Sequence, residues 1–423
     1  MLTAPDNELL TQVGPGTPMG DLFRRFWLPA MALYELPEPD CAPVRLRLLG
    51  EDLVAWRDTS GRVGVMRESC PHRGASMFFG RNEEDGLRCV YHGWKFDTEG
   101  RCIDMPNEPA ESNFKHKISA AAYPAQEYGG LIWVYMGPRD RLPELPALEA
   151  SLAPDDHRMV SKLLQRSNWA QQVEGNIDSA HVSFLHRWFD RSQSPSPDAK
   201  RRSEAVWAAR DGDGSPYLQV KETDYGFIYG ARRNAPDDQY YWRCTPFMLP
   251  AYTITPSVDW PRGWLCLVPA DDHSTWWFSC TFHPTEPIAN FAAARQLGRP
   301  STVAGTFVLP QNLGNDFLID REVQRTANFT GLPNNRVQDQ AVTDSMGLVM
   351  DRTKEHLGTT DLAIIAMRRV LMRAAVALQQ GVEPYQPAHP EVYRVRPLHV
   401  VNRERDFGAL LDNHRDDIVP AAQ

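Results

Sequence analysis

The chain has 423 residues, of which 42% are hydrophobic and 23% are charged, and these proportions are typical of a globular protein. Its length is sufficient for two substantial domains, each with its own core. The formal net charge is −9 and no run of basic residues occurs, which argues against nucleic acids and anionic membranes as partners.

The sequence also indicates the cellular compartment in which the protein is expected. No apolar run reaches the roughly eighteen residues that a membrane span needs, and the N-terminus has no positively charged segment followed by an apolar one. The seven cysteines are an odd number, and five of them are scattered along the chain. Reduced thiols in a cytoplasmic protein are therefore the expectation.

The first part of the chain predicts a short helix followed by strands. Residues 14–30 combine a Gly/Pro-rich turn with a short amphipathic segment, and Leu22, Phe26 and Trp27 are its expected packing residues. From about Val44 the hydrophobic period becomes two, which predicts alternating strands separated by a turn at 58–61. Further strands are expected at 94–106 and 131–137, and they complete a small β domain.

Two short loops within this domain each carry one cysteine and one histidine. The first reads Cys70-Pro-His72 and, after sixteen residues, the second reads Cys89-Val-Tyr-His92. Two sulfur and two nitrogen ligands could hold zinc tetrahedrally, or a [2Fe-2S] cluster in which the cysteines bind one iron and the histidines the other.

The surroundings of these residues favour iron over zinc. Zinc knuckles more often place two or more residues between the ligands of each half, whereas Pro71 alone separates the first pair. Gly74 and Gly93 follow the two histidines and would let backbone N–H groups approach bridging sulfides, which need hydrogen-bond donors.

The rest of the chain predicts a larger domain of mixed α and β structure. Residues 143–154 are rich in Pro, Leu and Ala and predict a linker. We expect a helix that enters a turn within 160–186, and an irregular segment at 287–345. A long amphipathic helix is predicted to begin at Asp361. Four aromatic, alternating segments between them predict one antiparallel sheet, at 217–233, 240–256, 263–270 and 274–284.

A second group of possible metal ligands lies in the segment from Glu174 to His186. Asp178 and His181 share a helix face, but His181 and His186 would be about 140° apart on a regular helix. A common metal therefore requires the helix to end, bulge or bend. A non-heme Fe(II) site needs two histidines and a carboxylate. The candidate carboxylates are Asp339, Asp344, Asp351, Glu355 and Asp361.

These two motifs together carry a family resemblance. The pattern C-x-H and C-x-x-H at 70–92 resembles the Rieske family, and E-G-x-x-D-x-x-H-x4-H at 174–186 resembles the mononuclear iron motif of Rieske non-heme oxygenases. Respiratory Rieske proteins carry two further cysteines, where this chain has Ala75 and Tyr91. The segments 14–30, 319–331 and 338–361 look like the phthalate dioxygenase (oxygenase component) branch of aromatic-ring-hydroxylating oxygenase alpha subunits.

The resemblance implies an α+β fold in three parts. Residues 1–40 would form an N-terminal segment that packs on the catalytic domain. Residues 41–142 would form an all-β Rieske [2Fe-2S] domain. Residues 143–423 would form the catalytic domain, an antiparallel sheet flanked by helices that holds mononuclear Fe(II).

The resemblance also implies roles for individual residues. Cys70, His72, Cys89 and His92 would bind the cluster. His181 and His186 would bind the iron together with Asp361, because the family carboxylate stands at the start of the long C-terminal helix. Asp178 would link His92 of one subunit to His181 of its neighbour, so that electrons pass between subunits of a homotrimer or of stacked trimers.

The implied activity is hydroxylation of an aromatic carboxylate by a ring-hydroxylating dioxygenase. Monooxygenation, or O- or N-demethylation of a methoxy- or methylamino-aromatic, is the alternative, and an electron-transfer protein without a second iron is a more remote one. Electrons would come from NAD(P)H through a separate flavin and ferredoxin-type reductase, because no dinucleotide fingerprint occurs in the chain. A fixed guanidinium would suit a carboxylate, and the candidates are Arg243, Arg232 and Arg233.

Overall fold

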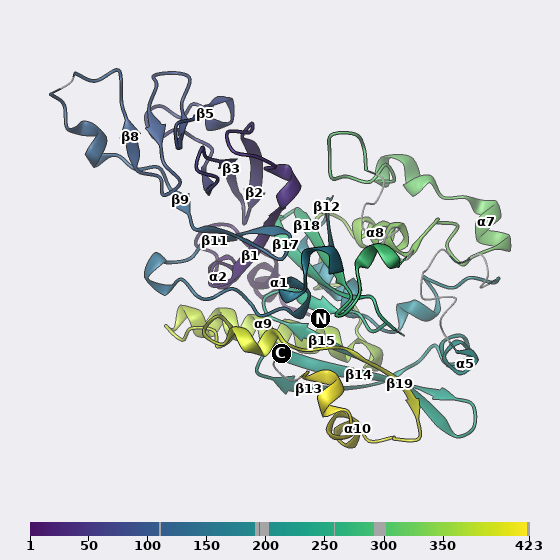
Figure 1. Cartoon of the computed structure of the whole chain (residues 1–423). Helices are drawn as coiled ribbons and strands as arrows, with labels where there is room; N and C mark the ends of the chain where they lie inside the picture. The colour runs from purple at the N-terminus through teal and green to yellow at the C-terminus, as the bar shows by residue number, and fades with distance from the viewer. Residues whose placement is uncertain (110, 191–193, 195–202, 258, 292–301, 421–423) are drawn as a thin grey trace.

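The computed structural model describes residues 1–109, 111–190, 194, 203–257, 259–291 and 302–420. Figure 1 shows a small β lobe at the upper left and a larger lobe built on a long antiparallel sheet, with helices around it. No helix in these residues is long and apolar enough to cross a membrane.

The small lobe consists of two four-stranded antiparallel sheets, which confirms the strands predicted between 44 and 106. The strand predicted at 131–137 forms, but it lies in a third sheet and does not complete this lobe. The first sheet has the order β2 (Val44–Leu48), β3 (Glu51–Arg57), β4 (Val63–Arg67) and β9 (Ala122–Tyr123). The second has the order β5 (Arg81–Glu83), β6 (Gly86–Arg88), β7 (Lys95–Phe96) and β8 (Cys102–Asp104). Trp56 in β3 is fully buried and packs against Gly64 in β4, where a Cβ atom would lie 2.4 Å from the indole ring.

The N-terminal residues connect the two lobes. Helices α1 (Ala4–Thr11) and α2 (Pro18–Phe23) pack against the C-terminal helix α9 (Leu362–Gln379). Strand β1 (Trp27–Ala32) forms a three-stranded sheet with β11 (Leu131–Tyr135) and β10 (Ala125–Tyr128). The Asn7 side chain donates to the Met350 carbonyl at 3.1 Å, so this segment is tied to the larger lobe.

The larger lobe is organised around an eight-stranded antiparallel sheet. Its order is β12, β18, β17, β16, β15, β14, β13, with β19 paired to β15. The strands are β12 (Arg158–Gln165), β13 (Tyr217–Thr223), β14 (Gly226–Ala235), β15 (Gln239–Met248), β16 (Tyr252–Ile254), β17 (Arg262–Asp271), β18 (Ser274–Phe282) and β19 (Leu398–Asn402). The predicted sheet is confirmed, but residues 160–165 form a strand rather than the predicted helix.

Eight further helices accompany the sheet in the described residues. They are α3 (Glu149–Leu152), α4 (Trp169–Ile177), α5 (Glu204–Gly212), α7 (Arg321–Thr326), α8 (Asn335–Ser345), the C-terminal helix α9 introduced above, α10 (Phe407–Asn413) and α11 (Arg415–Ile418). The predicted long helix is confirmed as α9. The prediction of an irregular segment at 287–345 is wrong in two places, because α7 and α8 lie within it.

Aromatic packing joins the three-stranded sheet to the large one. Trp133 of β11, Tyr252 of β16 and Trp264 of β17 are all fully buried, and the Trp133 ring centroid lies 6.2 Å from that of Trp264. Each such side chain contributes roughly 1.5–3 kcal/mol through burial. This continuous apolar core includes residues of both lobes. The cluster loops pack on a second, separate apolar core.

Candidate metal centres

The two loops that carry Cys70, His72, Cys89 and His92 lie side by side at the end of the small lobe. Each is a tight turn, in which the Gly74 amide donates to the Cys70 carbonyl at 2.9 Å and the Gly93 amide donates to the Cys89 carbonyl at 3.0 Å. Both glycines have positive φ, +76° and +79°, a conformation that other residues rarely adopt.

The four candidate ligands point toward one another. Both cysteines are buried and unpaired, and the two imidazole centroids are 4.5 Å apart. The His72 ring stacks on Trp94 at 4.3 Å. Burial, together with the neighbouring Cys89, raises the pKa of the Cys70 thiol to about 11.

This donor set fits a Rieske cluster. The Nδ1 atom of His72 is buried and has no hydrogen-bond partner among the described residues. A buried, unpartnered imidazole nitrogen beside two converging thiols is costly unless it binds a metal. Two cysteines on one side and two histidines on the other are the arrangement that a [2Fe-2S] cluster of this type requires.

The second centre begins where α4 ends. The helix stops at Ile177, Asp178 has extended backbone angles, and residues 181–183 form a single 3-10 turn. Of the three possibilities that the sequence left open, namely that the helix ends, bulges or bends, the structure shows that it ends, and the irregular backbone brings His181 and His186 together. Their Nε2 atoms are 3.2 Å apart.

A carboxylate from α8 completes this group. Asp339 Oδ1 lies 3.1 Å from His186 Nε2 and 3.8 Å from His181 Nε2. The three side chains are the group of potential metal ligands that the described residues bring within 4.8 Å of one another. Two imidazoles and one carboxylate that converge on one point fit Fe(II) and leave further coordination positions for other ligands.

The structure corrects the third ligand predicted from the sequence. Asp361 does not lie with the two histidines; it precedes α9 and its carboxylate accepts the Gly358 amide at 2.6 Å. The carboxylate therefore closes the 3-10 turn Thr359–Asp361 onto Gly358, and it makes no capping hydrogen bond to α9 itself. Asp339 was among the candidates, but it could be preferred only if residues 335–345 had been recognised as a helix that faces α4.

In both histidines the Nδ1 atom, which faces away from the point where the three side chains converge, contacts a neighbouring side chain. Asp178 Oδ2 lies 3.3 Å from His181 Nδ1, and its Oδ1 accepts the Ala180 amide at 2.7 Å. Burial by itself would raise the pKa of Asp178, but hydrogen bonding to His181 and its charge lower it below the ordinary value. His186 Nδ1 lies 2.7 Å from Gln338 Oε1.

A buried ion network fixes the helix that carries Asp178. Glu174 in α4 receives two hydrogen bonds from Arg352, both 2.9 Å long, and a third from Arg368 of α9 at 2.8 Å. Arg368 also pairs with Glu355. All four groups are nearly inaccessible to solvent. The network therefore holds α4 against α9 and sets the position of the loop that follows α4.

The three arginine candidates differ in their surroundings. Arg232 stacks on Tyr217 and Tyr240 and donates to the Arg405 carbonyl. Arg233 is fully buried and donates to the Ser179 carbonyl at 2.6 Å. Arg243 is half-buried and forms no ion pair with the residues that the structure describes.

Strand alternation places Arg243 on the face toward the iron site. Arg233 pairs directly with Tyr241 across β14 and β15, and Arg243 is two residues along from Tyr241, so both arginines lie on one face. That face meets Ser179, beside Asp178. Tyr229 interacts electrostatically with both Arg243 and Asp178, which places the three side chains near one another. Burial is the main reason that the pKa of Tyr229 rises to about 12.

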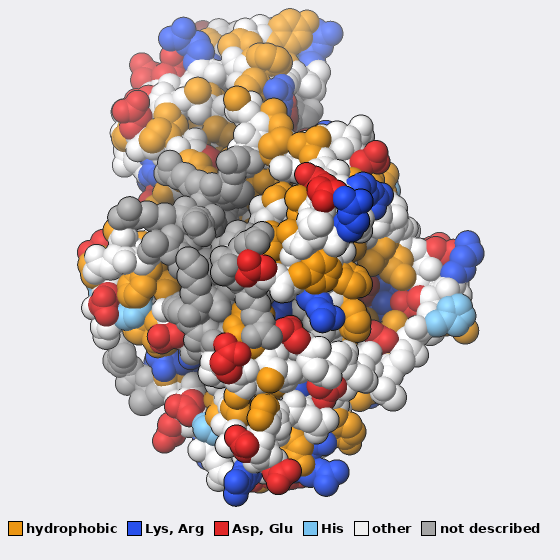
Figure 2. All heavy atoms as spheres, turned by 90° about the vertical axis from the view of Figure 1, so that its right-hand side faces the viewer, with side chains coloured by type: hydrophobic (Ala, Val, Ile, Leu, Met, Phe, Trp, Pro, Cys, Tyr) orange, Lys and Arg blue, Asp and Glu red, His pale blue; other side chains and the backbone are white. Residues whose placement is uncertain are grey.

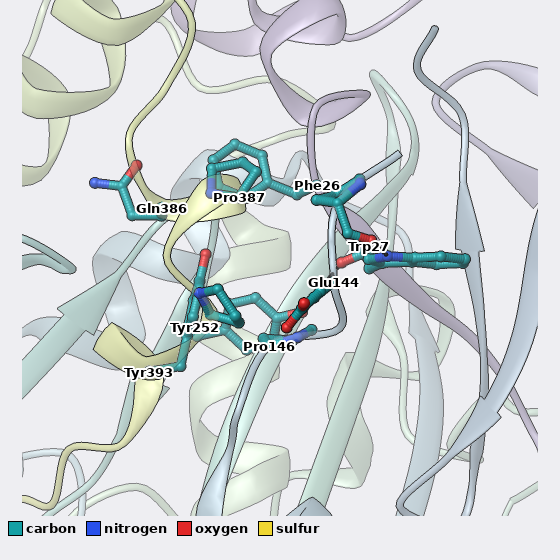
Figure 3. A pocket seen from close by; sticks show the side chains of 10 residues that line it. Phe26, Trp27, Glu144, Pro146, Tyr252, Gln386, Pro387 and Tyr393 are labelled. Carbon is teal, nitrogen blue, oxygen red and sulfur yellow. Dashed lines mark hydrogen bonds between the residues drawn. The ribbon is translucent and has the colours of Figure 1, made fainter. Parts of the chain in front are cut away.

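A separate depression lies between the N-terminal segment, the linker and residues 386–393 (Figure 3). Two of its polar groups have structural partners: Trp27 Nε1 donates to the Pro143 carbonyl at 2.8 Å, and the Tyr393 hydroxyl donates to the Leu249 carbonyl at 2.7 Å. None of the candidate metal ligands lines it. This depression therefore lies at the junction of several chain segments and does not belong to either metal centre.

Comparison with known families agrees with this geometry. Residues 26–124 match the Rieske [2Fe-2S] domain, and residues 134–411 match the family described as "LigXa C-terminal domain like". Dicamba monooxygenase bound to dicamba superposes with a TM-score of 0.58 at 17% identity, covering 85% of this chain and 99% of that one. The overall fold is thus that of the Rieske oxygenases.

Proteins of similar sequence define the family of this chain more narrowly than its fold does. It is 42% identical to the phthalate 4,5-dioxygenase oxygenase subunit of Pseudomonas putida, over 90% of this chain and 88% of the relative. It is 41% identical to the 3-chlorobenzoate-3,4-dioxygenase oxygenase subunit of Comamonas testosteroni, over 88% and 89%. It is 31% identical to the 5,5'-dehydrodivanillate O-demethylase oxygenase subunit of Sphingobium sp., over 96% and 88%.

These matches define the class first: the chain belongs to the Rieske non-heme iron oxygenases, enzymes that carry a [2Fe-2S] cluster and a mononuclear iron. Within that class it belongs to the branch of the phthalate dioxygenase oxygenase component. It is an oxidoreductase, the oxygenase component of a multicomponent system, and it needs a reductase as its partner.

Proposed function

We propose that this oxygenase hydroxylates an aromatic carboxylate with O2. The observation that carries the proposal is the convergence of His181, His186 and Asp339, which together with the phthalate and chlorobenzoate relatives points to oxygen chemistry on an aromatic acid. Cys70, His72, Cys89 and His92 would hold the cluster, and the three converging side chains would hold Fe(II). When bound, the cluster supplies electrons and the Fe(II) supplies the site at which O2 reacts.

Arg243 is the residue that we assign to the substrate carboxylate. It is half-buried on the sheet face that meets Ser179 and Asp178, and no acid of the described residues neutralises it. A guanidinium can bind a carboxylate through two parallel hydrogen bonds. Arg232 is a poorer candidate, because it lies on the opposite face and is already stacked between Tyr217 and Tyr240.

Within one chain the two metal centres lie far apart. In Figure 1 the β5–β8 sheet, whose strands β6 and β7 flank the loop of Cys89 and His92, is at the upper left, whereas α8 with Asp339 is at the right. The loop around His92 is exposed, with Val90 57% and Tyr91 55% accessible. We infer a homotrimer in which His92 of one subunit approaches Asp178 of the next, whose side chain is 23% exposed.

The surface beside the iron site suits such a contact. Figure 2 shows the face of the molecule at the right of Figure 1, and apolar side chains are interspersed there with both acidic and basic ones. Phe184, Phe189 and Phe329 are each about half exposed near His186. Exposed aromatic residues of this kind favour a protein contact.

The electron donor in this proposal is a flavin and ferredoxin-type reductase that uses NAD(P)H. All seven cysteines are unpaired in the structure, which supports a reducing compartment, and we propose the cytoplasm.

A demethylase or monooxygenase is the second candidate function. The observation in its favour is the 31% identity to an O-demethylase oxygenase subunit over nearly the whole chain. The same residues would hold the metals and the substrate, and the reactions differ in which carbon of the substrate reaches the iron.

A single-turnover experiment tests the proposal. The protein is reduced chemically, exposed to O2 with benzoates, phthalates and methoxy- or methylamino-aromatics, and the products are measured by mass spectrometry. A gain of two oxygens and two hydrogens establishes dioxygenation, and loss of CH2 establishes demethylation. Oxidation of the cluster without any product would contradict an oxygenase function and favour an electron carrier.

The role of Arg243 is tested by steady-state turnover of the same substrates with a reductase that supplies the electrons. Replacing it with glutamine should raise the KM for a carboxylated substrate by about 10–100-fold, because a charged hydrogen-bonded pair is lost. Replacing Arg232 with glutamine is the control and should change KM little. Equal effects of the two substitutions would refute the assignment.

A further inference from the structure

Gln338 sits beside the candidate iron site without being one of its ligands. It belongs to α8, directly precedes Asp339, and is completely buried. Its Oε1 atom lies 2.7 Å from His186 Nδ1, and Asp339 Oδ1 lies 3.1 Å from His186 Nε2. Two consecutive residues of one helix therefore contact the two nitrogens of the same imidazole.

The orientation of the Gln338 amide follows from its other contact. Its Nε2 atom donates to the Leu332 carbonyl at 3.2 Å. A backbone carbonyl can only accept a hydrogen bond, so the NH2 group must face Leu332 and the oxygen must face His186. The reversed amide would place two oxygens against each other in a buried site, which is strongly unfavourable.

The Leu332 carbonyl is itself held by the surrounding loop. It also accepts a hydrogen bond from the fully buried Asn328 side chain at 3.1 Å, and Asn328 Oδ1 accepts the Gly331 amide at 2.6 Å. The same loop pairs with the segment after His186, because the Phe329 amide donates to the Arg187 carbonyl at 3.0 Å. The amide of Gln338 is thus anchored to a loop that is itself bonded to the segment after His186.

We propose that Gln338 is a positioning residue that keeps the proton of His186 on Nδ1. An amide oxygen can only accept, so the hydrogen of the neutral imidazole must lie on Nδ1, and Nε2 keeps its lone pair directed at His181 and Asp339. Asp178 does the same for His181. This inference rests on the proposed function, in which those three side chains bind Fe(II).

The two histidines are therefore held by partners of unlike charge. Asp178 is an acid, whereas Gln338 is neutral and has both of its amide atoms engaged. A neutral partner fixes the ring and its tautomer without adding a further negative charge to the centre. An apolar residue at this position would leave Nδ1–H buried without an acceptor, or would move the proton to Nε2, where it blocks metal binding.

The test compares three variants of the full-length protein with the cluster in place. Gln338→Met removes the acceptor at similar volume. Gln338→Glu keeps an oxygen toward His186 and, as the neutral carboxyl group that burial favours, can donate its O–H to the Leu332 carbonyl. Gln340→Met is the matched control, because Gln340 is also buried in α8, but it donates to Asp344 at 3.1 Å and does not contact either histidine. The mononuclear iron is removed with a chelator, and Co²⁺ binding is measured by equilibrium dialysis.

Gln338→Met should bind Co²⁺ about 10–100-fold more weakly than wild type. Gln340→Met should bind within about threefold of wild type. Gln338→Glu should recover most of the lost affinity, since its neutral carboxyl group accepts from Nδ1–H and donates to the Leu332 carbonyl. Unchanged binding by Gln338→Met would overturn the inference. Equal weakening by Gln340→Met, or no recovery in Gln338→Glu, would do so as well, since both would indicate a merely structural role.

A second readout does not depend on metal binding. In metal-depleted protein labelled with 15N-histidine, the His186 signals, assigned with a His186→Asn variant, should show the Nδ1–H tautomer in wild type and a mixture in Gln338→Met. A wild-type protein that binds no Co²⁺ but shows this tautomer would refute the proposed iron site and still support Gln338 as the positioning residue. An Nε2–H tautomer in wild type would refute the role of Gln338.

Discussion

All four side chains of the cluster site come from two loops within residues 70–92, whereas the iron site combines the end of α4 with α8, and His186 and Gln338 are 152 residues apart in the sequence. The cluster loops are shaped by local turns at Gly74 and Gly93. The iron site depends on how two helices pack. The first site should therefore tolerate changes elsewhere in the fold, and the second should be sensitive to them.

The largest effect is expected for Asp339→Ala, which should abolish the iron site and leave the cluster site unchanged. Asp339→Ala removes one of three converging ligands, so the mononuclear iron should bind more than about 100-fold more weakly and turnover should fall to background. The visible spectrum of the cluster should remain unchanged, because its loops lie in the other lobe. Metal analysis and absorption spectroscopy measure the two outcomes. Full iron occupancy in this variant would show that another carboxylate is the ligand.

Asp178→Asn should slow electron transfer between the two metal sites, while both sites keep their metals. The amide can still hold the ring of His181, but it loses the charge that favours electron transfer between the centres, so turnover should fall by about 10–100-fold. Metal content and the rate of cluster oxidation in a single turnover check this. If the variant loses its iron, Asp178 contributes to binding of the metal rather than to coupling.

Glu174→Gln tests whether the iron site depends on distant packing. The substitution leaves Arg352 and Arg368 buried without their full counter-charge, so the larger lobe should lose about 3–5 kcal/mol of stability. Iron occupancy should fall on heating before the cluster spectrum changes. Glu99→Gln, which breaks an exposed pair with Arg101 in the small lobe, is the control and should cost about 1 kcal/mol or less. Similar melting curves for both variants would contradict the comparison.

The smallest effect is expected for Asp361→Ala, which is the counterpart of Asp339→Ala. Its carboxylate caps the turn before α9, so its loss should lower the stability by about 1 kcal/mol. Iron content and turnover should stay at the wild-type level. A chemical denaturation curve and metal analysis measure both quantities, and loss of iron here would restore Asp361 as a ligand.

The sequence was sufficient for features that depend on neighbours along the chain. The hydrophobic period of two predicted β2, β3, β4 and the strands β13 to β18, and the apolar stripe after Asp361 predicted α9. The cluster motif was visible because its spacing is imposed by two short turns. The five-residue separation of His181 and His186 indicated that the helix must end, since a regular helix would point the two rings in different directions.

Only the tertiary structure decided which carboxylate joins the two histidines. Asp339 and Asp361 are equally plausible as acids in a sequence, and the start of a long helix favoured Asp361. Helix α8 is rich in polar residues, and the buried Gln338, Gln340 and Asp344 are satisfied by hydrogen bonds to His186, the Leu332 carbonyl, Ser167 and one another. Its periodicity was therefore too weak to predict the helix or the ligand that it carries, and its partners are fixed by contacts that span more than 150 residues.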